Sequence, residues 1–300
     1  MRRPLLQLLP PSGTAAARVT PLLAGCTVVA VVTTLVTAGG RGLPGVASRQ
    51  RLEDNRHAAP SPAYGRVDAV NAVILLAAGV VLLNLYALAL VVARAPAFGT
   101  RLYRPMVLNI GLSVAPAVVL AVTTALLLLA VVLESPLLVW PVIAGGGVTW
   151  LLVLPNSAYL ITELNFSHRR QEEAVPLWYD IVLVLTLAVS GVMNTLLNVL
   201  LVQTMYLVVG YPNDAEPFTR VDSWVLSAVV LLLVTLGMYL GRYLRFNSWD
   251  VAHPRSFVRK LVGHFGQRAK RREALGFCVT HTVLLALLYL LVVGPAVATL

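Results

Sequence analysis

The 300-residue sequence has few charged residues, few acidic ones among them, and almost no cysteine. Only 12% of its residues are charged and 58% are hydrophobic, whereas soluble domains average about 25% charged and about 45–50% apolar residues. This composition excludes an ordinary soluble core. Cys26 and Cys278 lie far apart in apolar blocks with no CxxC spacing, so neither a disulfide nor a metal thiolate site is predicted.

Motifs of several catalytic chemistries are also missing. No serine or cysteine lies in a nucleophile elbow, so nucleophilic catalysis has no support. Side chains that suit zinc, manganese or magnesium are present at Glu163, His168, Asp180, Asp250 and His253. No pair of them has the HExxH spacing, and Asp250-x-x-His253 alone is a weak signal. The sequence therefore favours neither a metal nor another cofactor.

Long apolar blocks dominate what is present, and the mean hydropathy is +0.81. Blocks of about twenty or more residues have the length of helices that cross about 30 Å of hydrocarbon, whereas barrel strands would be short and alternating. We predict an all-α, polytopic transmembrane helical bundle of six to seven spans. The weakest is the first, which is rich in valine and threonine. The predicted spans are 21–38, 69–93, 106–133, 137–161, 177–209, 223–243 and 274–293.

The chain divides into two parts. Residues 1–68 hold a basic head, the weak first span and an arginine-rich link, and residues 69–293 hold the membrane bundle, with a basic loop at about 245–273. Within the bundle, Pro116 predicts a kink in the third span. Pro155 interrupts the fourth and leaves a carbonyl one turn earlier without its helical partner, so Asn156, Thr162 or water must pack inside the bundle there.

Arginine and lysine predict the orientation. Most of them fall on one side if the amino terminus is cytoplasmic, and the positive-inside rule then places the carboxy terminus outside a plasma membrane. The exception is the link at 41–68, which carries five arginines on the opposite side. Anionic lipid head groups at the cytoplasmic loop are the expected partners, nucleic acid is not expected, and protein partners stay open.

With this topology, three polar stretches at 150–163, 178–180 and 241–250 meet at the cytoplasmic face. An uncompensated charge deep in the bilayer costs roughly 2.5–3.5 kcal/mol, so carboxylates and arginines there are expected to pair. An alternative is that the tryptophans, tyrosines and arginines are ordinary interface anchors. The candidate polar cluster is Asn156, Thr162, Glu163, Asp180, Arg242, Arg245, Asn247 and Asp250.

Three further patterns predict contacts between helices. The stripe Ser190, Asn194 and Asn198 should face other helices, either to form hydrogen bonds or to line a pathway. Gly237 and Gly241 have the GxxxG spacing that permits close helix approach. His281, inside the last span, is expected to bond a neighbouring helix, with a role as a proton carrier as the alternative.

A basic amphipathic segment precedes the last span. It predicts a helix on the inner leaflet, acting as a topology anchor or a lipid sensor. Its apolar stripe is Phe257, Val258, Leu261, Val262 and Phe265, between Arg255, Arg259, Lys260, Arg268, Lys270, Arg271 and Arg272.

Three motifs of the chain resemble the bacterial membrane-protein family catalogued as domain of unknown function 1361. They are Leu-Pro-Asn-x-x-Tyr at 154–159, Trp-Tyr-Asp at 178–180 and Gly-Arg-x-x-Arg-x-Asn-Ser-Trp-Asp at 241–250. The resemblance covers roughly 69–293 and implies a polytopic membrane protein without supplying an activity. Glu163 departs from the family pattern, which the resemblance implies to be aspartate.

The sequence leaves three classes of function open. Binding or transport of a small solute or lipid head group predicts a water-accessible cavity lined by Glu163, Asp180, Arg242, Arg245 and Asp250. A membrane-embedded enzyme acting on a lipid-linked substrate, with or without dependence on a metal, predicts converging carboxylates without an arginine between them. A structural or accessory protein predicts saturated ion pairs and no cavity.

Overall fold

The computed structural model describes residues 62–164, 175–211, 213–214, 216–244 and 254–297, and within them it contains helices and no strand. This confirms the all-α prediction, while the predicted span at 21–38 and most of residues 1–68 lie outside the described part. The long helices are α2 (Pro62–Phe98), α3 (Arg104–Val132), α4 (Pro136–Val153), α6 (Leu177–Gly210), α7 (Val221–Tyr243) and α9 (Arg268–Val297). The short ones are α5 (Pro155–Ala158), η4 (Tyr159–Leu164), η5 (Pro217–Thr219) and α8 (Pro254–Phe265).

Six segments are long and apolar enough to cross a membrane, which confirms a polytopic bundle. They agree with the six predicted spans that lie in the described chain, and the span predicted at 137–161 has the predicted bounds. The six segments are Val73–Phe98, Arg104–Ala130, Leu137–Ile161, Leu177–Gly210, Val221–Tyr243 and Arg268–Pro295. The helix α2 begins at Pro62, within the predicted link, because proline has a suitable φ for a first helical turn and its missing N–H is not needed there.

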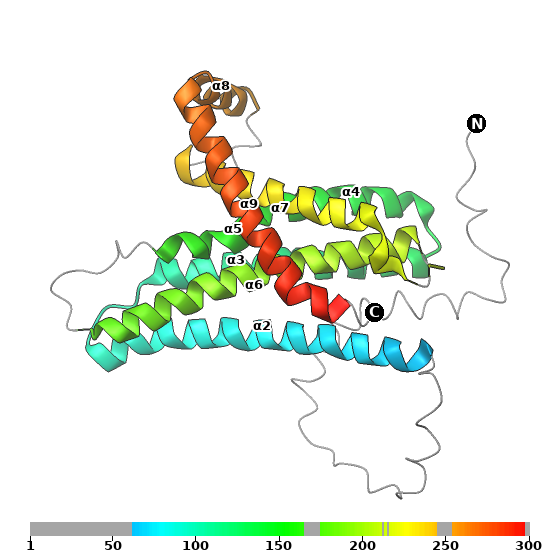
Figure 1. Ribbon diagram of the computed structural model, residues 1–300, viewed down its shortest axis with the longest axis horizontal. Coiled ribbons are helices and arrows are strands. Elements are labelled where there is room, and N and C mark those ends of the chain that lie inside the picture. Colours follow the sequence, from blue (N-terminus) through cyan, green and yellow to red (C-terminus); the bar gives the residue numbers. More distant parts are fainter. Residues whose placement is uncertain (1–61, 165–174, 212, 215, 245–253, 298–300) are drawn as a thin grey trace, which may run out of the picture.

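Two tight turns set the boundaries of the first spans. Gly99 has φ of +64° after α2, and the N–H of Thr100 donates to the carbonyl of Ala95 at 3.1 Å, which closes a helix end with a glycine in the left-handed region. Glu134 has φ of 50° after α3, where the N–H of Ser135 donates to Ala130 at 3.0 Å. The second turn reverses the chain, so that α3 and α4 form a hairpin (Figure 1).

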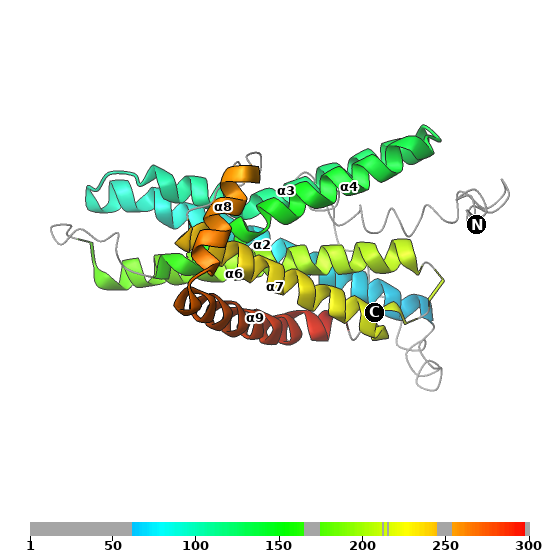
Figure 2. The ribbon, with the colours of Figure 1, turned by 90° about the horizontal axis from the view of Figure 1, so that it is seen from above.

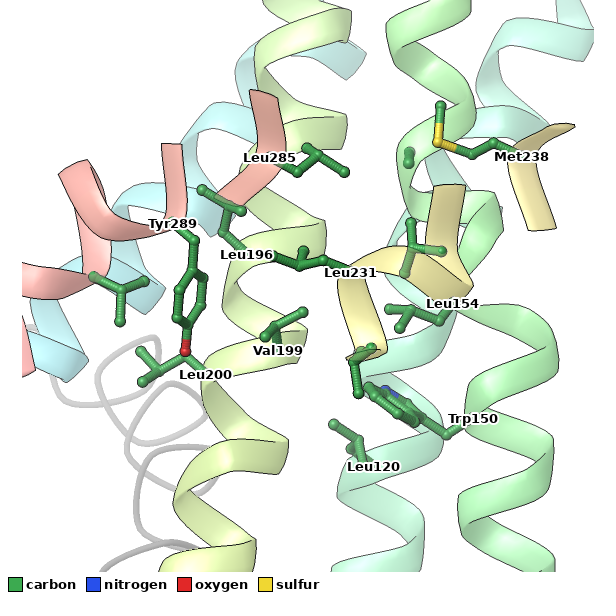
Figure 3. Packing of buried hydrophobic residues seen from close by; sticks show 14 of the residues in the cluster. Leu120, Trp150, Leu154, Leu196, Val199, Leu200, Leu231, Met238, Leu285 and Tyr289 are labelled. Atoms are coloured by element: carbon green, nitrogen blue, oxygen red, sulfur yellow. The ribbon is translucent and has the colours of Figure 1, made fainter. Parts of the chain in front are cut away.

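The helix α6 lies at the centre of the bundle and contacts α2, α3, α5, α7 and α9, as both ribbon views show (Figures 1 and 2). It is the most buried of the six spans. In an apolar stretch of 18 residues within α6, 61% of the residues are buried, whereas the corresponding fraction for the span that contains α4 is 11%. Leu196 and Leu200 of α6 form the core with Leu231 of α7 and Leu285 and Tyr289 of α9 (Figure 3). Side chains on the outer faces of the spans are exposed leucines and valines, as expected of surfaces that meet lipid.

The charged side chains separate into two ends of the bundle. One end, which we call the basic end, holds the last turns of α2 and α7, the first turns of α3, α6 and α9, and the helix α8. At the other, the α3–α4 turn and the α6–α7 link form the acidic end, whose described charges are Glu134, Asp214, Glu216, Arg220 and Asp222. Described charges at the basic end are Asp180, Glu273, Arg94, Arg101, Arg104, Arg242, Arg259, Lys260, Arg268, Lys270, Arg271 and Arg272.

Candidate functional site

The residues of the predicted polar cluster are described to different extents. Asn156 is half-buried in α5, Asp180 is 5% exposed in the first turn of α6, and Arg242 is exposed at the end of α7. Thr162 and Glu163 belong to η4, and their side chains lie outside the described part. The remaining three, Arg245, Asn247 and Asp250, also lie outside it. The convergence of the full cluster therefore stays a prediction.

Asp180 forms an ion pair with Arg94, which lies in the last turns of α2. The Nε of Arg94 donates to Oδ1 of Asp180 at 3.1 Å, and the two side chains are 16% and 8% exposed. Next to this pair, the hydroxyl of Tyr179 donates to the carbonyl of Leu90 at 2.7 Å. The Trp-Tyr-Asp motif thus fastens the start of α6 to the end of α2, while Trp178 remains 63% exposed at the level of the helix ends.

The fourth span is interrupted where the sequence predicts. Because Pro155 has no N–H, the helical bond from residue 155 to Leu151 cannot form, and α4 ends with the bond from Leu154 to Trp150 at 2.8 Å. The chain continues as the short α5, in which the backbone N–H of Ser157 donates to the carbonyl of Leu154 at 3.0 Å, and then as the tighter η4. We call the segment from α4 to η4 the interrupted span.

Three glycines on neighbouring helices make room for this segment, and we call them the glycine clasp. A Cβ on Gly191 of α6 would lie 2.7 Å from the carbonyl oxygen of Ser157 and 2.8 Å from Cβ of Leu160. On α7, a Cβ on Gly237 would overlap the ring of Pro155, and one on Gly241 would overlap the hydroxyl of Tyr159. The close approach predicted from the GxxxG spacing is confirmed, and its partner is the interrupted span.

A buried group of amides and hydroxyls lies beside the interruption. The side-chain amides of Asn84 and Asn194 donate to each other at 2.8 and 2.9 Å, and Asn194 also donates to the hydroxyl of Ser113 at 2.8 Å. Ser113 and Ser157 exchange two bonds, each hydroxyl donating to the other's carbonyl, at 3.1 and 2.7 Å. This amide network joins α2, α3, α5 and α6, and all four side chains are at most 9% exposed.

All three positions of the predicted stripe on α6 are buried, and two of them, Asn194 and Asn198, bond side chains of other helices. Asn198 accepts a bond from the indole N–H of Trp150 at 3.1 Å, so Trp150 is a buried structural residue and not the interface anchor that the alternative prediction made of it. The hydroxyl of Ser190 donates to Leu187 of its own helix at 2.9 Å. The prediction for His281 was wrong: its Nδ1 bonds the carbonyl of Phe277 one turn earlier, at 2.9 Å.

The acidic end holds a second polar cluster, which sequence reasoning missed. The carboxylate of Asp222 accepts bonds from the hydroxyls of Tyr206 and Tyr211 at 3.1 and 2.8 Å and from Arg220 at 3.1 Å. The guanidinium of Arg220 also lies 3.5 Å from the ring centroid of Tyr211. Hydrogen bonding to Asp222 raises the pKa of Arg220 above its ordinary value. In the sequence, the only signal for this cluster was that two tyrosines, an arginine and an aspartate lie close together around one short link. These residues are Tyr206, Tyr211, Arg220 and Asp222.

The described side chains do not bring three or more of His, Cys, Asp and Glu together in a group that could hold a metal ion. Asp180, the described carboxylate of the predicted cluster, lies against a guanidinium, whereas a metal site would need carboxylates converging on a cation.

Six apolar helices, one of them interrupted beside a buried polar network, define a polytopic α-helical membrane protein. The chain belongs to the family described as protein of unknown function, DUF1361, whose model matches residues 108–288. The match covers α4 to α7 and with them the interrupted span, the glycine clasp and the Trp-Tyr-Asp motif. No curated protein and no solved structure matches the chain.

Proposed function

We propose that the protein binds a small anionic solute or lipid head group at the basic end and passes it along the interrupted span. The observation that carries this proposal is the depth of the interruption. Asn84, Ser113 and Asn194 lie in the middle third of their spans, and the hydrogen bonds bring Ser157 of the interrupted span to the same level. Solute sites of many transporters lie near the bilayer midplane, where a discontinuous helix meets polar side chains from its neighbours.

The charge at the basic end supports an anionic ligand. Cationic side chains outnumber the described carboxylates there, and both of those carboxylates pair with a cation, Asp180 with Arg94 and Glu273 with Lys270. A surface of one sign raises the local concentration of oppositely charged ligands. By the positive-inside rule we assign this end to the cytoplasmic face of a plasma membrane.

A structural or accessory role is the second candidate, and one observation favours it. The side chains of the amide network satisfy one another, so that the network is complete without a ligand. A transporter with this architecture must exchange some of these bonds for bonds to its solute when the interrupted span moves. The two candidates therefore differ in whether reagents in water reach the network.

Single-cysteine labelling tests the proposal in a variant that lacks Cys26 and Cys278. Asn156→Cys and Ser113→Cys are exposed to a membrane-impermeant thiol reagent in inside-out vesicles, with Arg259→Cys as the reactive control. Leu287→Cys is the unreactive control, because Leu287 is 60% exposed on the outer face of α9 and faces lipid rather than water.

Labelling of both test positions, with protection by inorganic phosphate or by an anionic lipid, is the result expected of a solute path. Protection by phosphate identifies a free solute as the ligand, and protection by the lipid alone identifies a head group. If neither position reacts while Arg259→Cys does, the midplane is sealed on the cytoplasmic side, and the structural role replaces the proposal.

A further inference from the structure

The helix α8 lies apart from the packed spans at the basic end. Figures 1 and 2 together show it crossing the direction of α6 and α7, as a helix in the plane of a membrane surface would. Its carboxy-terminal residues hold it to the bundle: Nε2 of His264 lies 2.9 Å from the hydroxyl of Tyr239 on α7, and Phe265 packs in the cluster around Tyr239. The same hydroxyl donates to the carbonyl of Lys270 on α9 at 3.4 Å. One tyrosine thus fixes α8 against both neighbouring helices.

The apolar side chains of α8 are only partly used by this docking. Val258, Leu261, Val262 and Phe265 follow the spacing i, i+3, i+4 and i+7, which places them on one face of a helix. Leu261 and Phe265 are half-buried, but Val258 is 53% exposed and Val262 is 65% exposed. The apolar face of α8 therefore extends past its contact with the bundle, and Val258 and Val262 are exposed on it one helical turn apart.

Basic residues flank these valines. Arg259 and Lys260 are exposed on α8, and Arg268, Arg271 and Arg272 are exposed in the first turns of α9. The single described carboxylate among them is Glu273, which pairs with Lys270 at 2.9 Å. Apolar side chains bordered by cations match a leaflet surface in which acyl chains lie beneath negatively charged head groups.

We infer that α8 and the first turns of α9 form a binding surface for anionic lipids, with Val258 and Val262 inserted among the acyl chains and the flanking arginines and lysines on the head groups. This surface is independent of the proposed solute path, because it lies on the outside of the bundle. Its orientation depends on the contacts of Tyr239 with His264 and with Lys270, which hold the carboxy-terminal half of α8 near the end of α7 and the start of α9.

The test uses the full chain without Cys26 and Cys278, carrying an environment-sensitive fluorophore at Val262→Cys and reconstituted in phosphatidylcholine vesicles with and without phosphatidylglycerol. The neighbouring Gly263→Cys is the matched control, because residue 263 is exposed about 100° further around the helix, away from the valines. Spin-labelled lipids should quench the fluorophore at 262 more strongly than at 263, and phosphatidylglycerol should increase the difference.

Replacing Arg259 and Lys260 together by glutamine should reduce the effect of phosphatidylglycerol by about fivefold per charge removed, since each basic residue at an anionic surface is worth about 1 kcal/mol. High salt should act in the same direction. Equal quenching at 262 and 263, or quenching at 262 that phosphatidylglycerol does not change, overturns the inference. A fluorophore at 262 that is shielded from water but not quenched by lipid indicates a second copy of the chain on this face and also overturns it.

Discussion

Replacing Gly191 by alanine should destabilise the bundle, because the added methyl group meets atoms that cannot move independently. Its Cβ would lie 2.7 Å from a backbone oxygen of Ser157 and 2.8 Å from Cβ of Leu160, both in the interrupted span. Overpacking of this kind costs about 1–3 kcal/mol, and contact with backbone places the substitution at the upper limit. The higher helix propensity of alanine offsets about 1 kcal/mol, so that the net loss in the free energy of unfolding is about 2 kcal/mol.

The matched control is Gly276→Ala on α9, since a Cβ there meets nothing within 4 Å. This substitution should leave stability unchanged or raise it by up to about 1 kcal/mol. Both variants are unfolded with sodium dodecyl sulfate in mixed micelles and followed by circular dichroism. In a Cys26→Ser background, labelling of the buried Cys278 gives an independent report of opening.

If Gly191→Ala is as stable as Gly276→Ala, the interrupted span is not held tightly against α6, and the reasoning about the clasp is wrong. A companion pair sharpens the result on α7. Gly241→Ala should be destabilising alone, and Tyr159→Ala should relieve part of that loss in the double variant, because the added methyl group overlaps the tyrosine ring.

Three further predictions concern the polar contacts. Asn194→Leu should lower the unfolding free energy by about 1–3 kcal/mol in the same assay, and the double variant with Asn84→Leu should lose less than the two single variants together, because their amides bond each other. Asp180→Asn should lower the free energy of unfolding by about 3 kcal/mol, because it leaves the Arg94 guanidinium poorly compensated. Replacing both partners by apolar residues should recover stability. If the losses of the two single variants add fully in the double variant, the pairing is contradicted. Asp222→Asn should speed hydrogen exchange in residues 216–221 and in the last turn of α6 without changing the exchange of α6 before Tyr206, since its bonds join only that last turn to the link at the acidic end.

The sequence was sufficient for the spans because apolar length is a local property. The interruption at Pro155 was predictable for the same reason, as proline removes a helical bond whatever surrounds it. Contacts between distant segments were harder to predict. The structure pairs Asp180 with Arg94 of α2, because the end of α2 lies against the start of α6, and no local pattern in the sequence shows this packing.

The glycines illustrate the same limit. The spacing of Gly237 and Gly241 indicated a close approach but not the partner, and no spacing in the sequence indicated the close contact at Gly191. That all three face one short segment depends on how α6 and α7 flank the interrupted span. Likewise, Trp150 resembled an interface anchor, since a tryptophan near polar residues has that role more often than a bond to a buried asparagine.

The amide pair between Asn84 and Asn194 has a consequence for biosynthesis. The two residues are 110 positions apart, so a chain elongating at roughly 5–20 residues per second makes α2 roughly 5–20 s before the partner amide. During this interval the Asn84 amide lies in hydrocarbon without the partner it has in the finished bundle, a state that favours retention beside the insertion machinery or mispairing with another span. Chains truncated before α6 should therefore be recognised and degraded by membrane proteases, and the release of α6 into the bilayer is the step that gives the Asn84 amide its partner.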